Sequence, residues 1–135
     1  MTRDEWLTLY GRIWTDHEYS PEVIAKLFTE DAVYRPNVLH TIEAPYVGHA
    51  AIMGYMERVV PTLGWTQLSD GGVIDAGDWL IMQVWLSGLV EGEPCTEVLC
   101  TLYHFAPDGR CTEIRDYPQI ANAIVEPFAG WEVPA

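Results

Sequence analysis

The feature that most constrains the fold is a set of three long β-favouring runs separated by two short turns. The runs are residues 79–90, 95–105 and 111–117. The first gap contains Glu91-Gly92, and the second contains Pro107-Asp108-Gly109. An X-Gly pair between such runs is a strong hairpin signal, and Pro followed by Gly suits a three-residue loop. The pattern predicts three antiparallel strands in one sheet.

The two turns also predict which side chains share a face of this sheet. If Ala106 pairs with Arg110, Cys100 faces Asp116, and a two-residue turn at 91–92 places Gln83 beside Cys100. A large, apolar and aromatic face with a few polar groups results, and we expect it to line a small-molecule pocket. Its members are Trp79, Ile81, Gln83, Trp85, Cys100, Leu102, His104, Ile114 and Asp116. A slip of one residue would exchange the two faces.

The opposite face of the same strands is also apolar, and no predicted element remains to cover it. It carries Leu80, Met82, Val84, Leu86, Leu99 and Tyr103. A large exposed apolar patch usually marks an association surface, and two-fold pairing is the commonest way to bury one. We therefore expect a homodimer through the outer face of the sheet.

Helices are predicted ahead of the sheet. Residues 2–5 fit a capping box, and apolar residues at helical spacing follow as far as Trp14. Ser20-Pro21-Glu22 is typical of the start of a second helix. Apolar spacing predicts a third helix over residues 51–60, which Pro61 ends.

Two more strands, a loop and a tail complete the chain. The strands are expected at 32–35 and 65–74, with a loop over 36–48. The tail after Pro118 is apolar enough to pack back over the pocket or onto another subunit. Helices followed by a bent antiparallel sheet predict an α+β fold, in which the sheet curls as a half-open cone around the helices. One domain over residues 1–135 is expected.

Charge and cysteine usage exclude several classes of function. The net charge is −13 with Lys26 as the single lysine, which argues against nucleic acid and anionic membranes as partners. No stretch reaches the roughly 18 apolar residues that a membrane span needs. Three cysteines, without metal-ligand spacing or a signal peptide, indicate the cytoplasm. Neither a histidine cluster nor a phosphate or dinucleotide motif is present, so no metal or cofactor is expected.

Several segments resemble the nuclear transport factor 2-like superfamily. They are the run Leu27-Phe28-Thr29-Glu30-Asp31-Ala32-Val33-Tyr34, and Gly48 before His49-Ala50-Ala51-Ile52. Phe105–Gly109 and Ile114-Arg115-Asp116-Tyr117 resemble the end of its SnoaL-like polyketide cyclase branch. The likeness covers nearly the whole chain and implies the cone-shaped α+β fold. That fold hosts isomerases, cyclases, epoxide hydrolases, dehydratases and non-catalytic binders.

The resemblance also implies roles for single residues. In SnoaL-like cyclases and limonene-epoxide-hydrolase-like enzymes an aspartate of the closing strand is the acid or base, and Asp116 matches it. The hydrolases add an Arg and a second Asp on an earlier strand, where this chain has Gln83 and Trp85. Tyr34 and Asn37 match the pair that holds the attacking water, with one extra residue of spacing. The missing Asp-Arg-Asp unit argues against epoxide hydrolysis.

The residues themselves allow a catalytic and a structural interpretation. In an apolar pocket the pKa of Asp116 would rise, which makes it a proton shuttle, whereas in solvent it would only pair with Arg115 or Arg35. His104 could relay a proton or polarise a carbonyl, and Tyr34 could donate to an oxyanion; each could equally be a packing residue. The expected substrate-binding residues are Trp14, Asn37, His40, Trp79, Gln83, Trp85, Cys100 and Leu102.

These observations favour a cofactor-independent enzyme that acts on a hydrophobic, polyketide- or terpenoid-like molecule. Proton transfer by Asp116 would drive an isomerisation, a cyclisation or a related lyase step. The alternatives are a hydrolase that activates water and a non-catalytic small-molecule-binding module. A buried Asp116 with a raised pKa favours the enzyme, and a solvated Asp116 favours the binder.

Overall fold

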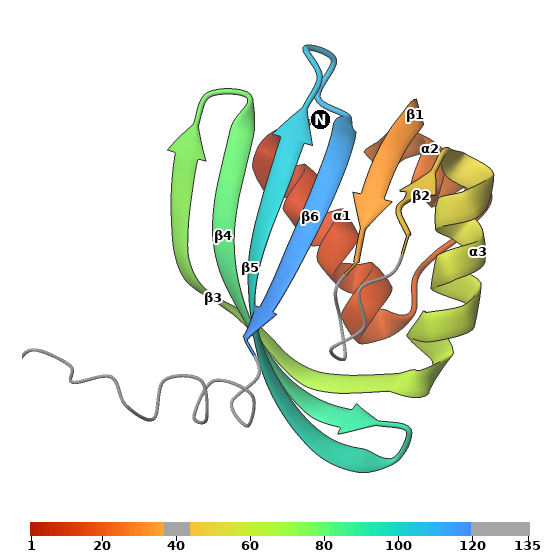
Figure 1. The fold of residues 1–135 in the computed structure, drawn as a ribbon, viewed down its shortest axis with the longest axis vertical. Coiled ribbons are helices and arrows are strands. Elements are labelled where there is room, and N and C mark those ends of the chain that lie inside the picture. The colour runs from red at the N-terminus through yellow and green to blue at the C-terminus, as the bar shows by residue number, and fades with distance from the viewer. Residues whose placement is uncertain (37–43, 120–135) are drawn as a thin grey trace, which may run out of the picture.

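The computed structural model describes residues 1–36 and 44–119 (Figure 1). Asn37, His40 and the apolar tail that was predicted to pack back lie outside the described residues. The helices are α1 (Arg3–Asp16), α2 (Pro21–Leu27) and α3 (His49–Val59), with a 3₁₀ turn, η2 (Val60–Thr62). The strands are β1 (Phe28–Arg35), β2 (Tyr46–Val47), β3 (Leu63–Ala76), β4 (Trp79–Val90), β5 (Glu93–Phe105) and β6 (Cys111–Gln119).

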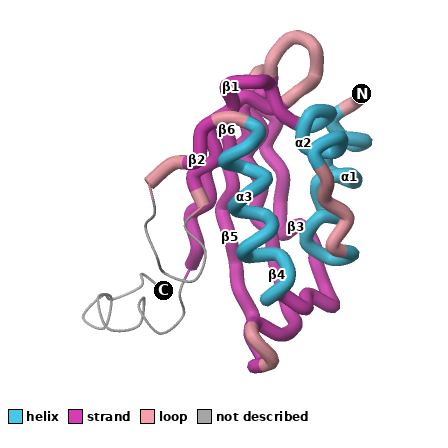
Figure 2. Tube along the Cα trace, turned by 90° about the vertical axis from the view of Figure 1, so that its right-hand side faces the viewer, coloured by secondary structure: helices cyan, strands magenta, loops and turns pink. Residues whose placement is uncertain are grey.

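The described strands form one sheet in the order β2-β1-β6-β5-β4-β3. Strand β1 runs parallel to β6, and the other neighbouring pairs are antiparallel. The three helices lie on one face of this bent sheet, and α1 crosses behind β5 and β6 (Figures 1 and 2). The sheet curls without closing, so the α+β cone predicted from the sequence is confirmed.

Local capping explains where the first two helices begin. The Thr2 side chain accepts from the Glu5 backbone N–H, and the Glu5 carboxylate accepts from the Thr2 N–H, as the capping box predicts. The Ser20 hydroxyl caps α2 by accepting from the Val23 N–H, with Pro21 at the first helical position. Strand β1 begins at Phe28, directly after α2, rather than at residue 32 as predicted.

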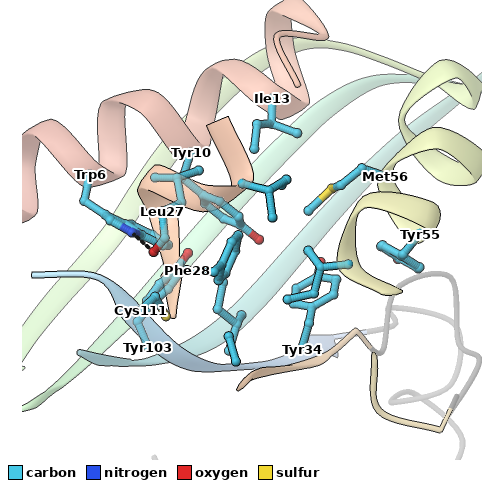
Figure 3. Packing of buried hydrophobic residues seen from close by; sticks show 14 of the residues in the cluster. Trp6, Tyr10, Ile13, Leu27, Phe28, Tyr34, Tyr55, Met56, Tyr103 and Cys111 are labelled. Carbon is cyan, nitrogen blue, oxygen red and sulfur yellow. Dashed lines mark hydrogen bonds between the residues drawn. The ribbon is translucent and has the colours of Figure 1, made fainter. Parts of the chain in front are cut away.

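The core lies between the helices and the concave face of the sheet. Trp6 of α1 is fully buried, and its indole N–H donates to the carbonyl oxygen of Leu27 at 2.8 Å. Tyr10 reaches from the same helix into the centre of the core, where Tyr34 of β1 and Tyr103 of β5 also lie (Figure 3). A second, smaller cluster joins the start of β3, the second half of β4 and the middle of β5. Its members are Leu63, Trp65, Val84, Leu86 and Leu99.

A β-bulge makes the predicted pairing of β5 with β6 wrong by one residue. The turn is as predicted, since the Ala106 N–H donates to the carbonyl oxygen of Arg110. Phe105 then pairs with Cys111, but His104 pairs with Glu113, so Thr112 is an extra residue on β6. The extra residue reverses the side chains of β6 relative to β5. Asp116 consequently pairs with Thr101 and not with Cys100.

The shift exchanges the predicted inner and outer faces of β4 and β5. Their predicted register is correct, with Gln83 beside Cys100, but the side chains that were expected outside lie inside the cone. Leu80, Val84, Leu86, Leu99 and Tyr103 are buried, and Met82 is half-buried. The prediction that these residues form a dimer interface is therefore wrong.

Gly88 shows how closely β3 and β4 approach at a second bulge, where Thr66 is the extra residue. A Cβ on Gly88 would overlap the carbonyl oxygen of Gly64 and would lie 2.7 Å from the Cα of Trp65. Backbone atoms cannot move aside without distorting the strand pair. We expect Gly88→Ala to lower the free energy of unfolding by about 2–3 kcal/mol in urea titrations.

Gly54→Ala provides the matched control for that measurement. Gly54 is exposed in the middle of α3, and an added Cβ would meet no atom within 4 Å. The same substitution should here raise the free energy of unfolding by about 0.5–1 kcal/mol, because alanine favours the helix over glycine. A Gly88→Ala variant as stable as the wild type would contradict the close approach of β3 and β4.

Candidate active site

A cavity of about 310 Å³ lies between α1 and the concave face of the sheet. Its wall is mostly apolar and aromatic, and a small number of polar groups are set into it. Such a wall is typical of small-molecule sites. The polar and aromatic residues of the wall include Tyr10 and Trp14 from α1, Tyr34 from β1, Trp65 and Asp70 from β3, Glu97, Thr101 and Tyr103 from β5, and Asp116 from β6; Met82 of β4 is among the apolar ones.

Asp116 is a buried carboxyl group in this wall, with an exposed fraction of 4%. Its Oδ1 accepts a hydrogen bond from the Thr101 hydroxyl at 2.9 Å, and its Oδ2 accepts one from the Tyr34 hydroxyl at 3.3 Å. Thr101 is its direct partner on β5. Tyr34 pairs with Ile114 on the parallel strand, two residues before Asp116, so both side chains point into the cone.

Burial raises the pKa of Asp116 to about 6. The hydrogen bonds from Thr101 and Tyr34 act in the opposite direction, because they stabilise the carboxylate, and the negative charge of Glu97 raises the pKa further. A carboxyl group with a pKa near neutrality can both accept and donate a proton under physiological conditions. Perturbed groups of this kind in clefts are candidates for catalysis.

Three buried tyrosines surround this carboxyl group. Burial raises the pKa of Tyr10, Tyr34 and Tyr103 well above the usual value, and the charge of Asp116 raises each pKa further. Their hydroxyl groups therefore stay protonated at neutral pH and can donate hydrogen bonds. These hydroxyl groups can donate hydrogen bonds to the Asp116 carboxylate or to a carbonyl oxygen of a ligand.

Glu97 is a second buried carboxyl group in the same wall, with an exposed fraction of 5%. It lies four residues before Thr101 on β5, and alternation along the strand places both on the concave face. Glu97, Thr101, Tyr10 and Tyr103 were not among the predicted site residues. Alternation along β5 places Glu97, Thr101 and Tyr103 on one face, so the sequence could have grouped them. The reversed face assignment placed Tyr103 outside the pocket.

Of the predicted site residues that the structure describes, Asp116, Tyr34 and Trp14 line the cavity. The other predicted residues within the described chain do not border it, and alternation along β4 and β5 places them on the convex face of the sheet. They are Trp79, Gln83, Trp85, Cys100, Leu102 and His104. The prediction that this face lines the pocket is wrong, because the bulge at Thr112 reverses it.

His104 was predicted to be catalytic but lies on the convex face of the sheet, away from the cavity. Its imidazole packs against the Trp79 ring, with 4.7 Å between the ring centroids, and it is hydrogen-bonded to the Thr112 hydroxyl. These contacts hold it on the convex side of the sheet, whereas Asp116 points to the concave side. Trp85, expected as a pocket wall, is 52% exposed.

Comparison with known proteins places the chain in a family. The SnoaL-like domain family matches residues 9–114, and the protein belongs to it. The fold and the family together place it in the SnoaL-like branch of the nuclear transport factor 2-like superfamily, as the resemblance implied. A comparison with curated proteins found no match.

Solved structures share the fold at low sequence identity. A hypothetical protein with a ketosteroid isomerase-like fold from Catenulispora acidiphila, solved in complex with trimethylamine, aligns over 98% of this chain and 100% of its own, with 20% identity and a TM-score of 0.70. A SnoaL-like polyketide cyclase candidate from Jannaschia sp. aligns over 90% of both chains, with 13% identity and a TM-score of 0.65. A nuclear transport factor 2-like protein from Anabaena variabilis aligns over 87% of both chains, with 13% identity and a TM-score of 0.72.

No helix within residues 1–36 and 44–119 is long and apolar enough to cross a membrane. No group of three or more His, Cys, Asp or Glu side chains in these same segments is arranged to hold a metal ion.

Proposed function

We propose that the protein is a cofactor-independent isomerase or cyclase that acts on a hydrophobic, carbonyl-bearing small molecule of polyketide or terpenoid type. The observation that carries the proposal is Asp116, a buried carboxyl group with a pKa of about 6 in the wall of an aromatic cavity. Membership of the SnoaL-like family supports the same class of chemistry.

The proposed reaction begins with the ionised Asp116. Its carboxylate removes a proton from the carbon next to the carbonyl group, and the electron pair of that C–H bond passes into an enolate. If Asp116 returns the proton to a different carbon, the substrate is isomerised. If the enolate carbon instead attacks a second carbonyl carbon of the same molecule, a ring closes and the proton passes to the new alkoxide. Buried tyrosine hydroxyl groups would stabilise the developing oxyanion.

Exchange of carbon-bound hydrogen for deuterium tests this proposal without knowledge of the product. The protein is incubated in D₂O with a panel of aliphatic ketones, cyclic enones and β-diketones. We expect deuterium next to the carbonyl group of at least one compound well above the buffer background, measured by mass spectrometry. Ligands that quench Trp14 and Trp65 fluorescence but never exchange would contradict the enzyme and indicate a non-catalytic binding module.

We also propose a homodimer through the convex face of the sheet, with residues other than those predicted from the sequence. No helix among the described residues covers this face (Figure 2). Large apolar side chains are exposed there, with Ile74 at 61%, Trp85 at 52% and Tyr117 at 48%. A patch of this kind usually marks an association surface.

Sedimentation velocity at micromolar concentration tests the dimer. We expect the wild type to sediment as a dimer and Trp85→Lys to sediment as a folded monomer, because a charge in a two-fold interface meets its own copy. Ala25→Lys adds the same charge on the exposed side of α2 and should leave the dimer intact. A monomeric wild type would rule out this interface.

A further inference from the structure

We propose that the cavity takes a cationic ligand, an organic molecule with a protonated or quaternary amine attached to its apolar body. The inference rests on the proposed function in one respect: it assigns a substrate class to the same cavity.

Among the described residues of the wall, the charged groups all have one sign. The described residues that line the cavity include Asp70, Glu97 and Asp116, and they include no Lys, Arg or His. Glu97 and Asp116 are 5% and 4% exposed, so water screens them poorly. Electrostatic interactions are stronger in such a setting than in bulk solvent. The wall therefore attracts a positive charge and repels an anionic ligand.

Aromatic rings supply the second part of a cation site. Trp14, Trp65, Tyr10 and Tyr103 contribute rings to the same wall. The faces of aromatic rings attract ammonium groups, and the attraction increases when water is excluded. Rings beside carboxylates are a setting in which a bulky alkylammonium group binds well. The overall net charge of −13 adds a long-range attraction for cations.

A cationic substrate also suits the proposed reaction. Asp116 becomes neutral when it accepts the proton, so Glu97 is the carboxylate that repels the new enolate. A fixed positive charge on the same substrate offsets that repulsion. The cation also favours the ionised form of Asp116, which is the form that accepts a proton. Binding and catalysis would then reinforce each other.

The titratable groups around Asp116 define the expected pH dependence. Tyr10 from α1, Tyr34 from β1, and Glu97 and Tyr103 from β5 act on it. The tyrosines stay neutral at both pH values, because burial raises the pKa of each well above its usual value. Since the pKa of Asp116 is about 6, its negative charge is mostly lost at pH 5 and mostly present at pH 7.5. Affinity for a permanent cation should therefore rise between these two values.

The test compares two molecules of the same shape, phenyltrimethylammonium and its neutral isostere tert-butylbenzene. Binding is measured by calorimetry and by tryptophan fluorescence in low salt. At pH 7.5 we expect the cation to bind at least about tenfold more tightly than the isostere, and we expect this preference to shrink at pH 5. Glu97→Gln should weaken binding of the cation several-fold and leave binding of tert-butylbenzene unchanged.

The outcomes separate this inference from the proposed function. If tert-butylbenzene binds the wild type as tightly as the cation at pH 7.5, the inference is wrong, even where neutral ketones exchange deuterium. If the cation is preferred but no carbonyl compound exchanges, the inference on ligand charge stands and the proposed enzyme fails. Should Glu97→Gln not fold, the preference of the wild type at the two pH values decides the question alone.

Discussion

Replacing Asp116 with Asn should reduce deuterium exchange by about 10²–10⁴-fold, the range that general acid–base catalysis contributes. The amide has nearly the shape of the carboxyl group, but it cannot accept a proton near neutral pH. The Thr101 and Tyr34 hydroxyl groups can still hydrogen-bond to it, so the cavity wall should stay in place. Mass spectrometry of the exchanged ketone, at matched protein concentration, measures the loss.

Two control variants separate the proton-accepting role from a general effect of charge. Glu93→Gln removes an exposed carboxyl group at the start of β5, outside the cavity wall, and we expect exchange close to that of the wild type. Thr101→Val removes the hydrogen bond that lowers the pKa of Asp116. The acid limb of the pH profile should then move to higher pH, since the carboxylate loses a stabilising partner. Exchange in Asp116→Asn equal to that of the wild type would exclude Asp116 from the mechanism.

The fold could be predicted because its determinants are local. Both residues of the Glu91-Gly92 turn have positive φ, at 51° and 82°, as tight hairpin turns require. That turn specifies the register of β4 with β5, which the sequence analysis predicts correctly. The capping box of α1 and the Ser-Pro start of α2 are equally local signals, and both helices begin where expected.

The inner face of the sheet could not be predicted, because it depends on one extra residue. Cys111-Thr112-Glu113 contains no glycine or proline to indicate a bulge. The alternation of side chains along β6 is also the same with and without the bulge, so it does not distinguish the two pairings. A shift of one residue reverses every side chain of β5 relative to β6. Asp116 was still identified, because the resemblance to the SnoaL-like branch rests on its position in the closing strand. Its neighbours Glu97 and Thr101 required the correct register.

Buried and partly desolvated, Asp116 should also make the protein less stable as the pH rises. Its pKa is about 6 in the folded protein, against 3.8 for an unperturbed carboxyl group. Between these values the folded state binds more protons than the unfolded state, so the free energy of unfolding falls with increasing pH. The stability that Asp116 contributes is fully present below pH 3.8 and is lost above about pH 6. The difference between the two values corresponds to about 3 kcal/mol, an upper figure for a single group.

Asp116→Asn removes this cost and should therefore stabilise the protein at pH 8 by about 1–3 kcal/mol, with little effect at pH 4. Urea titrations of both proteins at the two pH values measure the difference. Other groups act in the opposite direction. Hydrogen bonding to Arg115 lowers the pKa of Glu113, so Glu113 stabilises the fold more at high pH. Such contributions are the same in the variant and the wild type and cancel in the comparison. A variant that is both inactive and more stable at pH 8 would identify Asp116 as a group whose position disfavours folding and serves the reaction. A variant that loses stability equally at pH 4 and pH 8 would instead show that Asp116 acts through its hydrogen bonds to Thr101 and Tyr34, and would argue against the raised pKa.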